Sequence, residues 1–298
     1  MNTLHQALTE YLKLRRAFGY KLDRLETRLR RFLSFLDGKG TSRITTAMAL
    51  QFATEQSQRA QATKIGYLCA VRGFAQYLAS SDSTVEVPPP GLLRPALSRF
   101  RPYIYSDEEI RRLLTAALRI PSAKRCIGRY GLKPWTLHCI LGLLAVTGLR
   151  VSEATGLKSE DIDWSEGVLK ITSTKFLKSR LVPLHPSTLK QLRSYAKRRD
   201  RFFAERAQGS FPRFFVTCCG TPCRRGNVGH DFRKLSRQIG LRAPGAKHGP
   251  RIHDMRHRFA VMTLLRWYRS GKQVDRLLPV LSTYLGHSHV TGTYWYLS

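Results

Sequence analysis

Residues 137–157, LHCILGLLAVTGLRVSEATGL, decide the fold of the second part of the chain. The apolar run through residue 146 predicts a buried helix, and it stops at Thr147 and Gly148, where glycine suits a left-handed helix cap. Arg150 stands just beyond this helix end, with Glu153 three residues further on. By itself such a pair is more often a helix salt bridge than a site, so the stretch leaves both interpretations open.

The segments around this helix predict a mixed fold. Residues 167–172 and 180–183 are typical of paired strands, and the turn between them carries Lys175 and Lys178. Between residues 4 and 80, apolar residues recur every three or four positions in three groups, which predicts helices. We therefore expect a mainly α protein with a small antiparallel β-sheet.

A proline-rich stretch separates the two parts. Residues 80–95, SSDSTVEVPPPGLLRP, cannot continue a helix. The next clear helix start is SDEE at residues 106–109, which has the pattern of a capping box. We expect a helical N-terminal domain at 1–85, an interdomain linker at 86–104, and a mixed α/β domain at 105–298.

The charge of the chain points to a polyanionic partner. Lys and Arg number 51 and Asp and Glu 20, giving a formal net charge of +31. Nucleic acid is favoured over a membrane surface or a generic basic surface, because each neutralised phosphate releases counterions. A row of arginines on the second helix, with few acids beside it, fits phosphate contacts. The candidate DNA contacts are Arg24, Arg28, Arg31, Lys64, Arg72, Lys178 and Arg180.

Neither a membrane protein nor a secreted one is indicated. The longest apolar run is far too short to span a bilayer, and the N-terminus lacks the features of a signal peptide. We expect a cytoplasmic protein with no membrane partner.

The cysteines and histidines do not indicate a metal site. The six cysteines are scattered, which argues against a disulfide framework. Cys219, Cys223 and His230 could supply part of a zinc site, and His253 and His257 have the spacing of a zinc helix. Both sets lack further ligands at the required spacing. We expect no bound metal.

Four polar segments stand at the edges of the expected elements. They are TGLRVSE at 147–153, TKFLKSRLVPL at 174–184, HDMRH at 253–257, and LGH at 285–287 followed by a tyrosine at 296. In this order they resemble the catalytic signature of the tyrosine recombinases, the phage integrase family. Met255 stands where leucine is more usual, which is a conservative apolar change.

The resemblance spans residues 106–296. It implies a catalytic domain of the tyrosine recombinase type, preceded by a helical core-binding domain that the N-terminal part matches only in character. The residues that fall on the family's catalytic positions are Arg150, Lys175, His253, Arg256, His287 and Tyr296.

The resemblance also implies a role for each of these residues. The two arginines hold the scissile phosphate, and Tyr296, nine residues after His287, is the nucleophile. Lys175 is the hairpin lysine, and Lys178 is a second lysine that is structural or contacts DNA. Glu153 and His257 are supporting residues.

Elementary chemistry supports these roles. Phosphodiester cleavage places negative charge on the non-bridging oxygens, which two planar guanidiniums can bind bidentately. A phenol has an unperturbed pKa of about 10 and needs a base, for which His253 is the candidate. A lysine on a turn can supply the proton to the leaving 5′-oxygen. The resemblance implies a 3′-phosphotyrosyl intermediate that conserves bond energy, so we expect no metal, ATP or other cofactor.

We therefore expect a site-specific DNA recombinase or integrase, or a tyrosine-type transposase, associated with the prokaryotic nucleoid. Its expected partners are a double-stranded recombination site, further protomers in a synaptic tetramer, and accessory DNA-bending or directionality proteins. A type IB topoisomerase and a non-catalytic DNA-binding relative are the alternatives. Only Leu297 and Ser298 follow Tyr296, where the family usually continues with a segment that docks on a neighbouring protomer.

Overall fold

The computed structural model describes residues 4–20, 22–55, 60–95, 101–121, 131–172, 179–204, 211–246, 248–287, 289 and 291–294. The chain divides into two compact units, Met1–Phe100 and Arg101–Ser298. We describe each unit by itself.

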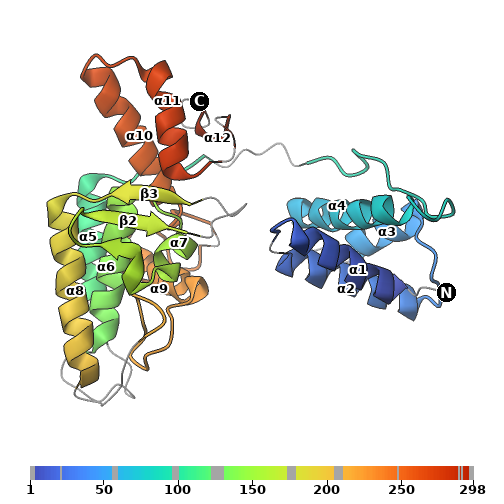
Figure 1. Cartoon of the computed structure of the whole chain (residues 1–298), viewed down its shortest axis with the longest axis horizontal. Helices are drawn as coiled ribbons and strands as arrows, with labels where there is room; N and C mark the ends of the chain where they lie inside the picture. The colour runs from blue at the N-terminus through green and yellow to red at the C-terminus, as the bar shows by residue number, and fades with distance from the viewer. Residues whose placement is uncertain are drawn as a thin grey trace. The chain divides into compact units, whose positions relative to one another are not determined.

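The first unit is helical (Figure 1). Its helices are α1 (Leu4–Ala17), α2 (Asp23–Gly38), α3 (Thr46–Thr54) and α4 (Gln61–Leu78). The core forms because α2 presents an apolar stripe in which Leu29, Phe32 and Leu36 are buried. Phe52 of α3 lies against Phe32, with ring centroids 5.2 Å apart, so aromatic contacts join neighbouring helices.

The second unit combines helices with one small sheet. Its helices are α5 (Asp107–Leu118), α6 (Leu132–Thr147), α7 (Val151–Gly156), α8 (Pro186–Ala204), α9 (Arg225–Gln238), α10 (Asp254–Arg269), α11 (Val274–Leu285) and α12 (Thr291–Tyr294), with a 3₁₀ turn at Ser159–Asp161. Its strands are β1 (Ile162–Asp163), β2 (Val168–Ile171) and β3 (Arg180–Pro183). All neighbouring strands are antiparallel, in the order β1-β2-β3.

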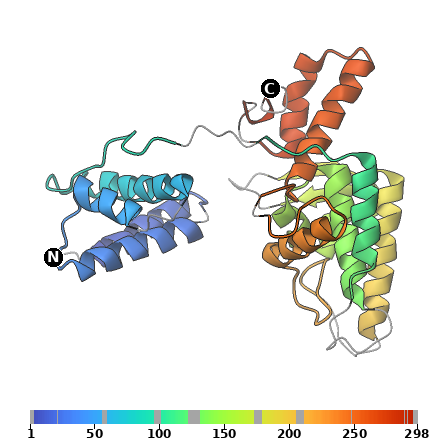
Figure 2. The same ribbon diagram turned by 180° about the vertical axis from the view of Figure 1, so that it is seen from behind.

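Helix α6 forms the centre of this unit. Because α6 is apolar on every side, it has to be surrounded, and it packs against α5, α8 and α10. Figure 2 shows α5 and α8 from behind, running alongside α6. The α10–α11 hairpin extends beyond the sheet and has a small apolar core of its own.

The expected fold class is confirmed, and the two expected strands pair as β2 and β3. The capping box that opens α5 is also present, with Ser106 and Glu109 bonded reciprocally. The two-residue strand β1 was not predicted. Among the described cysteines Cys218 is in a disulfide, which the sequence did not predict either, whereas the other four are free thiols. None of the described helices is both long and apolar enough to cross a membrane.

Two glycines end the helices that meet at the site. Gly148 caps α6 with φ +62°, and Gly286 caps α11 with φ +68°. Glycine takes up this left-handed conformation without the steric cost that a Cβ brings. Both glycines therefore turn the chain sharply while keeping their carbonyl groups at the helix ends.

We predict that Gly148→Ala lowers the free energy of unfolding by at least about 1–2 kcal/mol, the cost of a left-handed residue that has a Cβ. The added Cβ would also lie 2.6 Å from Cδ1 of Phe259. Gly142→Ala is the matched control, because its Cβ would meet only Leu114, at 3.8 Å, and alanine favours a helix by about 1 kcal/mol. Urea unfolding of the two variants measures the difference. Equal effects would contradict the role of Gly148.

Candidate active site

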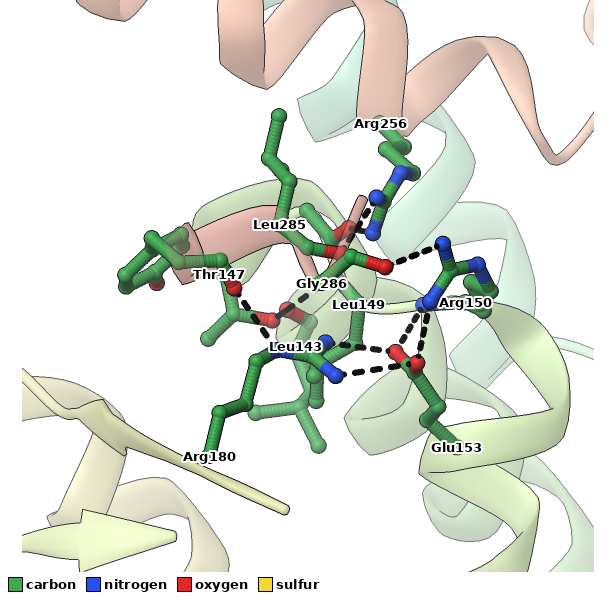
Figure 3. Close-up of polar contacts among 11 residues, drawn as sticks. Leu143, Thr147, Leu149, Arg150, Glu153, Arg180, Arg256, Leu285 and Gly286 are labelled. Carbon is green, nitrogen blue, oxygen red and sulfur yellow. Dashed lines mark hydrogen bonds and ion pairs between the residues drawn. The ribbon is translucent and has the colours of Figure 1, made fainter. Parts of the chain in front are cut away.

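Arg256 joins the ends of two helices. It lies in the first turn of α10 and is only 2% exposed. Its Nη1 donates to the carbonyl oxygen of Gly148 at 2.9 Å, and its Nη2 donates to the carbonyl of Leu285. The C-terminal ends of α6 and α11 are therefore tied together by one buried guanidinium (Figure 3).

Arg150 reaches the same helix end from the start of α7. Its Nη2 donates to the carbonyl oxygen of Gly286 at 2.8 Å, and its Nη1 donates to Oε1 of Glu153, also at 2.8 Å. Its backbone N–H donates to the other carboxylate oxygen of Glu153. The Arg150 side chain nevertheless keeps 32% of its surface exposed, more than that of Arg180.

Arg180 is the third guanidinium of the cluster. Nη1 and Nη2 donate to the two carboxylate oxygens of Glu153, at 3.1 and 2.8 Å, and Nε donates to the carbonyl of Tyr284 at 2.7 Å. Arg180 therefore pairs bidentately with Glu153 and also reaches α11. The sequence alone suggested a DNA contact for Arg180, whereas in the structure its side chain is only 7% exposed and bonded to the protein.

The last turn of α11 thus offers three consecutive carbonyls to three different arginines. A helix C-terminus carries a partial negative charge and unsatisfied carbonyl groups, so it stabilises cations there. The one carboxylate among these contacts is that of Glu153. Burial alone would raise the pKa of Glu153, but hydrogen bonds and charges from Arg180 and Arg150 outweigh it and hold that pKa below its ordinary value. Three cations and one anion leave the cluster positive, as an anion site requires.

His253 is the N-cap residue of α10 and is exposed to solvent. Its ring meets that of His257 edge-on, with centroids 5.3 Å apart. Partial burial of the ring, with the nearby His257 and Arg256, lowers the pKa of His253 to about 4. The imidazole is therefore neutral at pH 7 and able to accept a proton.

His287 follows the glycine cap of α11. Burial first, and then the charges of Arg256 and Arg150, lower its pKa to about 4. The three arginines that reach the end of α11 are thus close enough to act on this ring. Its Nδ1 lies 2.9 Å from Oγ1 of Thr293, a fully buried residue of α12. Thr293 was not among the predicted site residues, since a lone threonine carries no signal of such a contact.

Lys175, Lys178 and Tyr296 lie outside the described residues. The structure does describe residues that lie near them in the sequence. Ile171 and Arg180, which lie on either side of both lysines in the sequence, pair between β2 and β3. Tyr294, the tyrosine two residues before Tyr296, lies on α12 and is 53% exposed.

The N-terminal candidates for DNA contact differ in their surroundings. Arg28 donates to the carbonyl of Gly66, and Arg31 to the hydroxyl of Tyr67. Arg72 donates to the carbonyls of two linker prolines. Arg24 is exposed and lines, with Arg28, an open pocket of about 570 Å³, whereas Lys64 is half-buried. Their contacts with DNA stay predictions.

Across the part of the chain that the structure describes, no group of three or more His, Cys, Asp or Glu side chains is arranged to hold a metal ion. The chemistry that this cluster offers is that of guanidinium and imidazole groups around an anion.

The known proteins that the chain resembles belong to one group. The model of the phage integrase family matches residues 106–298. The chain is 49% identical over its whole length to y4rB of Sinorhizobium fredii, whose name describes an integrase/recombinase, and the match covers 93% of that protein. It is 30% identical to the tyrosine recombinase XerC of Chlorobaculum tepidum, over 77% of this chain and 66% of the relative.

Two solved structures share the fold across 99% of the chain. One is a lambda integrase dimer bound to a COC′ core site, with a TM-score of 0.62, 19% identity and 77% of that chain covered. The other is the Tn1549 transposon integrase in complex with a circular intermediate DNA, with a TM-score of 0.66, 16% identity and 95% of that chain covered.

The fold and these relatives define an enzyme class, the tyrosine-type site-specific DNA recombinases. The chain belongs to the phage integrase family.

The lowered pKa values of His253 and His287 predict that the free protein loses stability as the pH falls from about 6.5 toward 4. In this window an unfolded histidine, with a pKa of about 6.5, binds a proton that the folded protein does not accept. Protonation then favours the unfolded state. The melting temperature of wild type should fall more steeply between pH 7 and 5 than that of a His253→Gln, His287→Gln double variant. Parallel curves would contradict the expected shifts.

Proposed function

We propose that the chain cleaves and rejoins the strands of a double-stranded DNA recombination site through a 3′-phosphotyrosyl intermediate, with Tyr296 as the nucleophile. The observation that carries the proposal is the meeting of Arg150 and Arg256 on adjacent carbonyls of one helix end. Guanidiniums held this close can bind the non-bridging oxygens of one phosphate together.

The two arginines stabilise the charge that develops during the reaction. When an oxygen attacks phosphorus, negative charge accumulates on the non-bridging oxygens. Arg150 and Arg256 are fixed by the protein before DNA arrives, so little reorganisation is needed when that charge appears. Comparable stabilisation by an arginine is worth about 10³–10⁵ in rate in phosphoryl transfer.

His253 is the proposed general base. A phenol is unreactive while it keeps its proton. The neutral imidazole of His253 takes this proton as the Tyr296 oxygen forms its bond to phosphorus. An approaching phosphate brings negative charge, which moves the pKa of His253 upward from about 4. The base therefore becomes stronger once the substrate is bound.

Lys175 is the proposed general acid. As the new P–O bond to tyrosine forms, the bond from phosphorus to the 5′-oxygen breaks, and the leaving oxygen needs a proton. Lys175 supplies it, and Lys178 contacts DNA beside it. His287 donates to a non-bridging oxygen, while Glu153 and His257 support the arginines and His253. In the reverse step a 5′-hydroxyl attacks the phosphotyrosine and restores the phosphodiester, so no outside energy source is required.

The remaining parts of the proposal concern assembly. Residues 1–85 form the core-binding domain and 105–298 the catalytic domain, joined by the linker at 86–104. Exposed cations of the first unit, Arg24 among them, bind phosphates on the site. We propose a tetramer on two synapsed sites, with accessory DNA-bending or directionality proteins, acting on the prokaryotic nucleoid in the cytoplasm.

The test is a covalent trap on a nicked recombination site. Loss of the short strand beyond the nick prevents rejoining, so wild-type protein should form an adduct that survives denaturant, also in the presence of EDTA. Tyr296→Phe should form none, because it lacks the attacking oxygen. Tyr294→Phe is the matched control and should retain the adduct. An adduct formed by Tyr296→Phe but not by Tyr294→Phe would contradict the assignment of the nucleophile.

A further inference from the structure

Arg180 differs from Arg150, the other arginine bonded to Glu153, in how it is placed. It begins β3, and each of its three side-chain nitrogens donates to Glu153 or to the carbonyl of Tyr284. Its side chain is 7% exposed, against 32% for that of Arg150. A guanidinium whose three nitrogens all donate to acceptors of the protein is poorly placed to contact DNA directly.

The carboxylate of Glu153 is shared evenly between two arginines. Oε1 accepts from Nη1 of Arg150 and from Nη1 of Arg180. Oε2 accepts from the backbone N–H of Arg150 and from Nη2 of Arg180. The four donors match the roughly four acceptor sites of a carboxylate. Glu153 is thereby held in one orientation, and it holds Arg150 in turn (Figure 3).

Removing Arg180 would disturb this balance. Glu153 is buried and charged, and a buried carboxylate that loses one partner draws the other more strongly. Arg150 could then turn toward Glu153 and lose its bond to the Gly286 carbonyl. Arg180 also fastens α11 through Tyr284, two residues before that carbonyl. Both effects would shift the guanidinium of Arg150.

We propose that Arg180 is a positioning residue that sets the orientation of Arg150 through Glu153 and the last turn of α11, and that it does not contact the DNA. The inference rests on the proposed role of Arg150 as a ligand of the scissile phosphate. It replaces the DNA-contact role that the sequence alone suggested for Arg180.

The test compares two nicked sites that differ in one substituent on the scissile phosphorus. One has the normal scissile phosphate, and the other has a methylphosphonate, in which a methyl group replaces one non-bridging oxygen and removes the negative charge. A group that acts on that charge matters less on the neutral linkage. Cleavage and DNA binding are measured for wild type, Arg180→Ala, Arg180→Lys and Arg150→Ala. Arg193→Ala is the matched control, since Arg193 is an exposed arginine bonded to the Trp164 carbonyl.

For Arg180→Ala we expect binding within about threefold of wild type and cleavage of the normal phosphate about 10- to 100-fold slower, as for a displacement of order 1 Å. The loss should shrink at least about fivefold on the methylphosphonate, because it acts through phosphate charge. Arg180→Lys keeps a charge beside Glu153 but cannot also reach Tyr284, so its loss should be intermediate. Arg193→Ala should behave as wild type on both sites.

The outcomes separate this inference from the proposed function. If the loss of cleavage is smaller on the methylphosphonate for Arg150→Ala but not for Arg180→Ala, only the positioning role of Arg180 is overturned. If the loss for Arg150→Ala is equally large on both sites, the proposed role of Arg150 is overturned, and with it the inference that Arg180 acts through Arg150. A large loss of binding in Arg180→Ala, with normal cleavage by the bound fraction, shows a direct DNA contact. If Arg180→Ala melts below the assay temperature, the same comparison is made with Arg180→Lys.

Discussion

The bonds from Arg256 to the ends of α6 and α11 are the contact on which the arrangement of the site depends. Each helix ends in a left-handed glycine, so its last carbonyls point outward instead of continuing the helix. Two helix C-termini repel each other as partial negative charges, and a buried guanidinium between them removes that repulsion. The same guanidinium can serve a phosphate only because the helices have already fixed it.

The electrostatic design of the cluster follows from this constraint. Cations could be held together by an equal number of carboxylates, but such a cluster would be neutral and a poor site for a phosphate. Here Glu153 is shared by two arginines, and backbone carbonyls supply the remaining acceptors. Carbonyls orient a guanidinium while adding only partial charge. Burial first, and then the nearby positive charges, lower the pKa values of His253 and His287 and keep both imidazoles neutral.

Much of the fold could be predicted because its signals are local. The apolar run before Thr147 and the glycine after it predicted the end of α6. The short strand-like segments 167–172 and 180–183, joined by a turn, predicted β2 and β3. The two-residue strand β1 could not be predicted, since so short a segment carries no periodicity.

The candidate site was predictable as a set of residues but not as a set of contacts. The order of the four motifs identified four candidate residues, which are Arg150, His253, Arg256 and His287. Arg180 shows what the sequence leaves open. Next to two lysines it has the pattern of a DNA contact, yet its partners lie 27 positions earlier, at Glu153, and 104 positions later, at Tyr284. The neutral state of His253 has the same origin, because it depends on burial and on charges brought near by folding.

The most direct measurement of the central claim is mass spectrometry of the trapped protein after digestion with protease and nuclease. We predict one modified peptide, at the C-terminal end of the chain, with the 3′-phosphate of a nucleotide on the oxygen of Tyr296. Formation of this peptide should be unchanged by EDTA. A nucleotide joined through its 5′-phosphate, or attached to Tyr294 or another residue, would contradict the account.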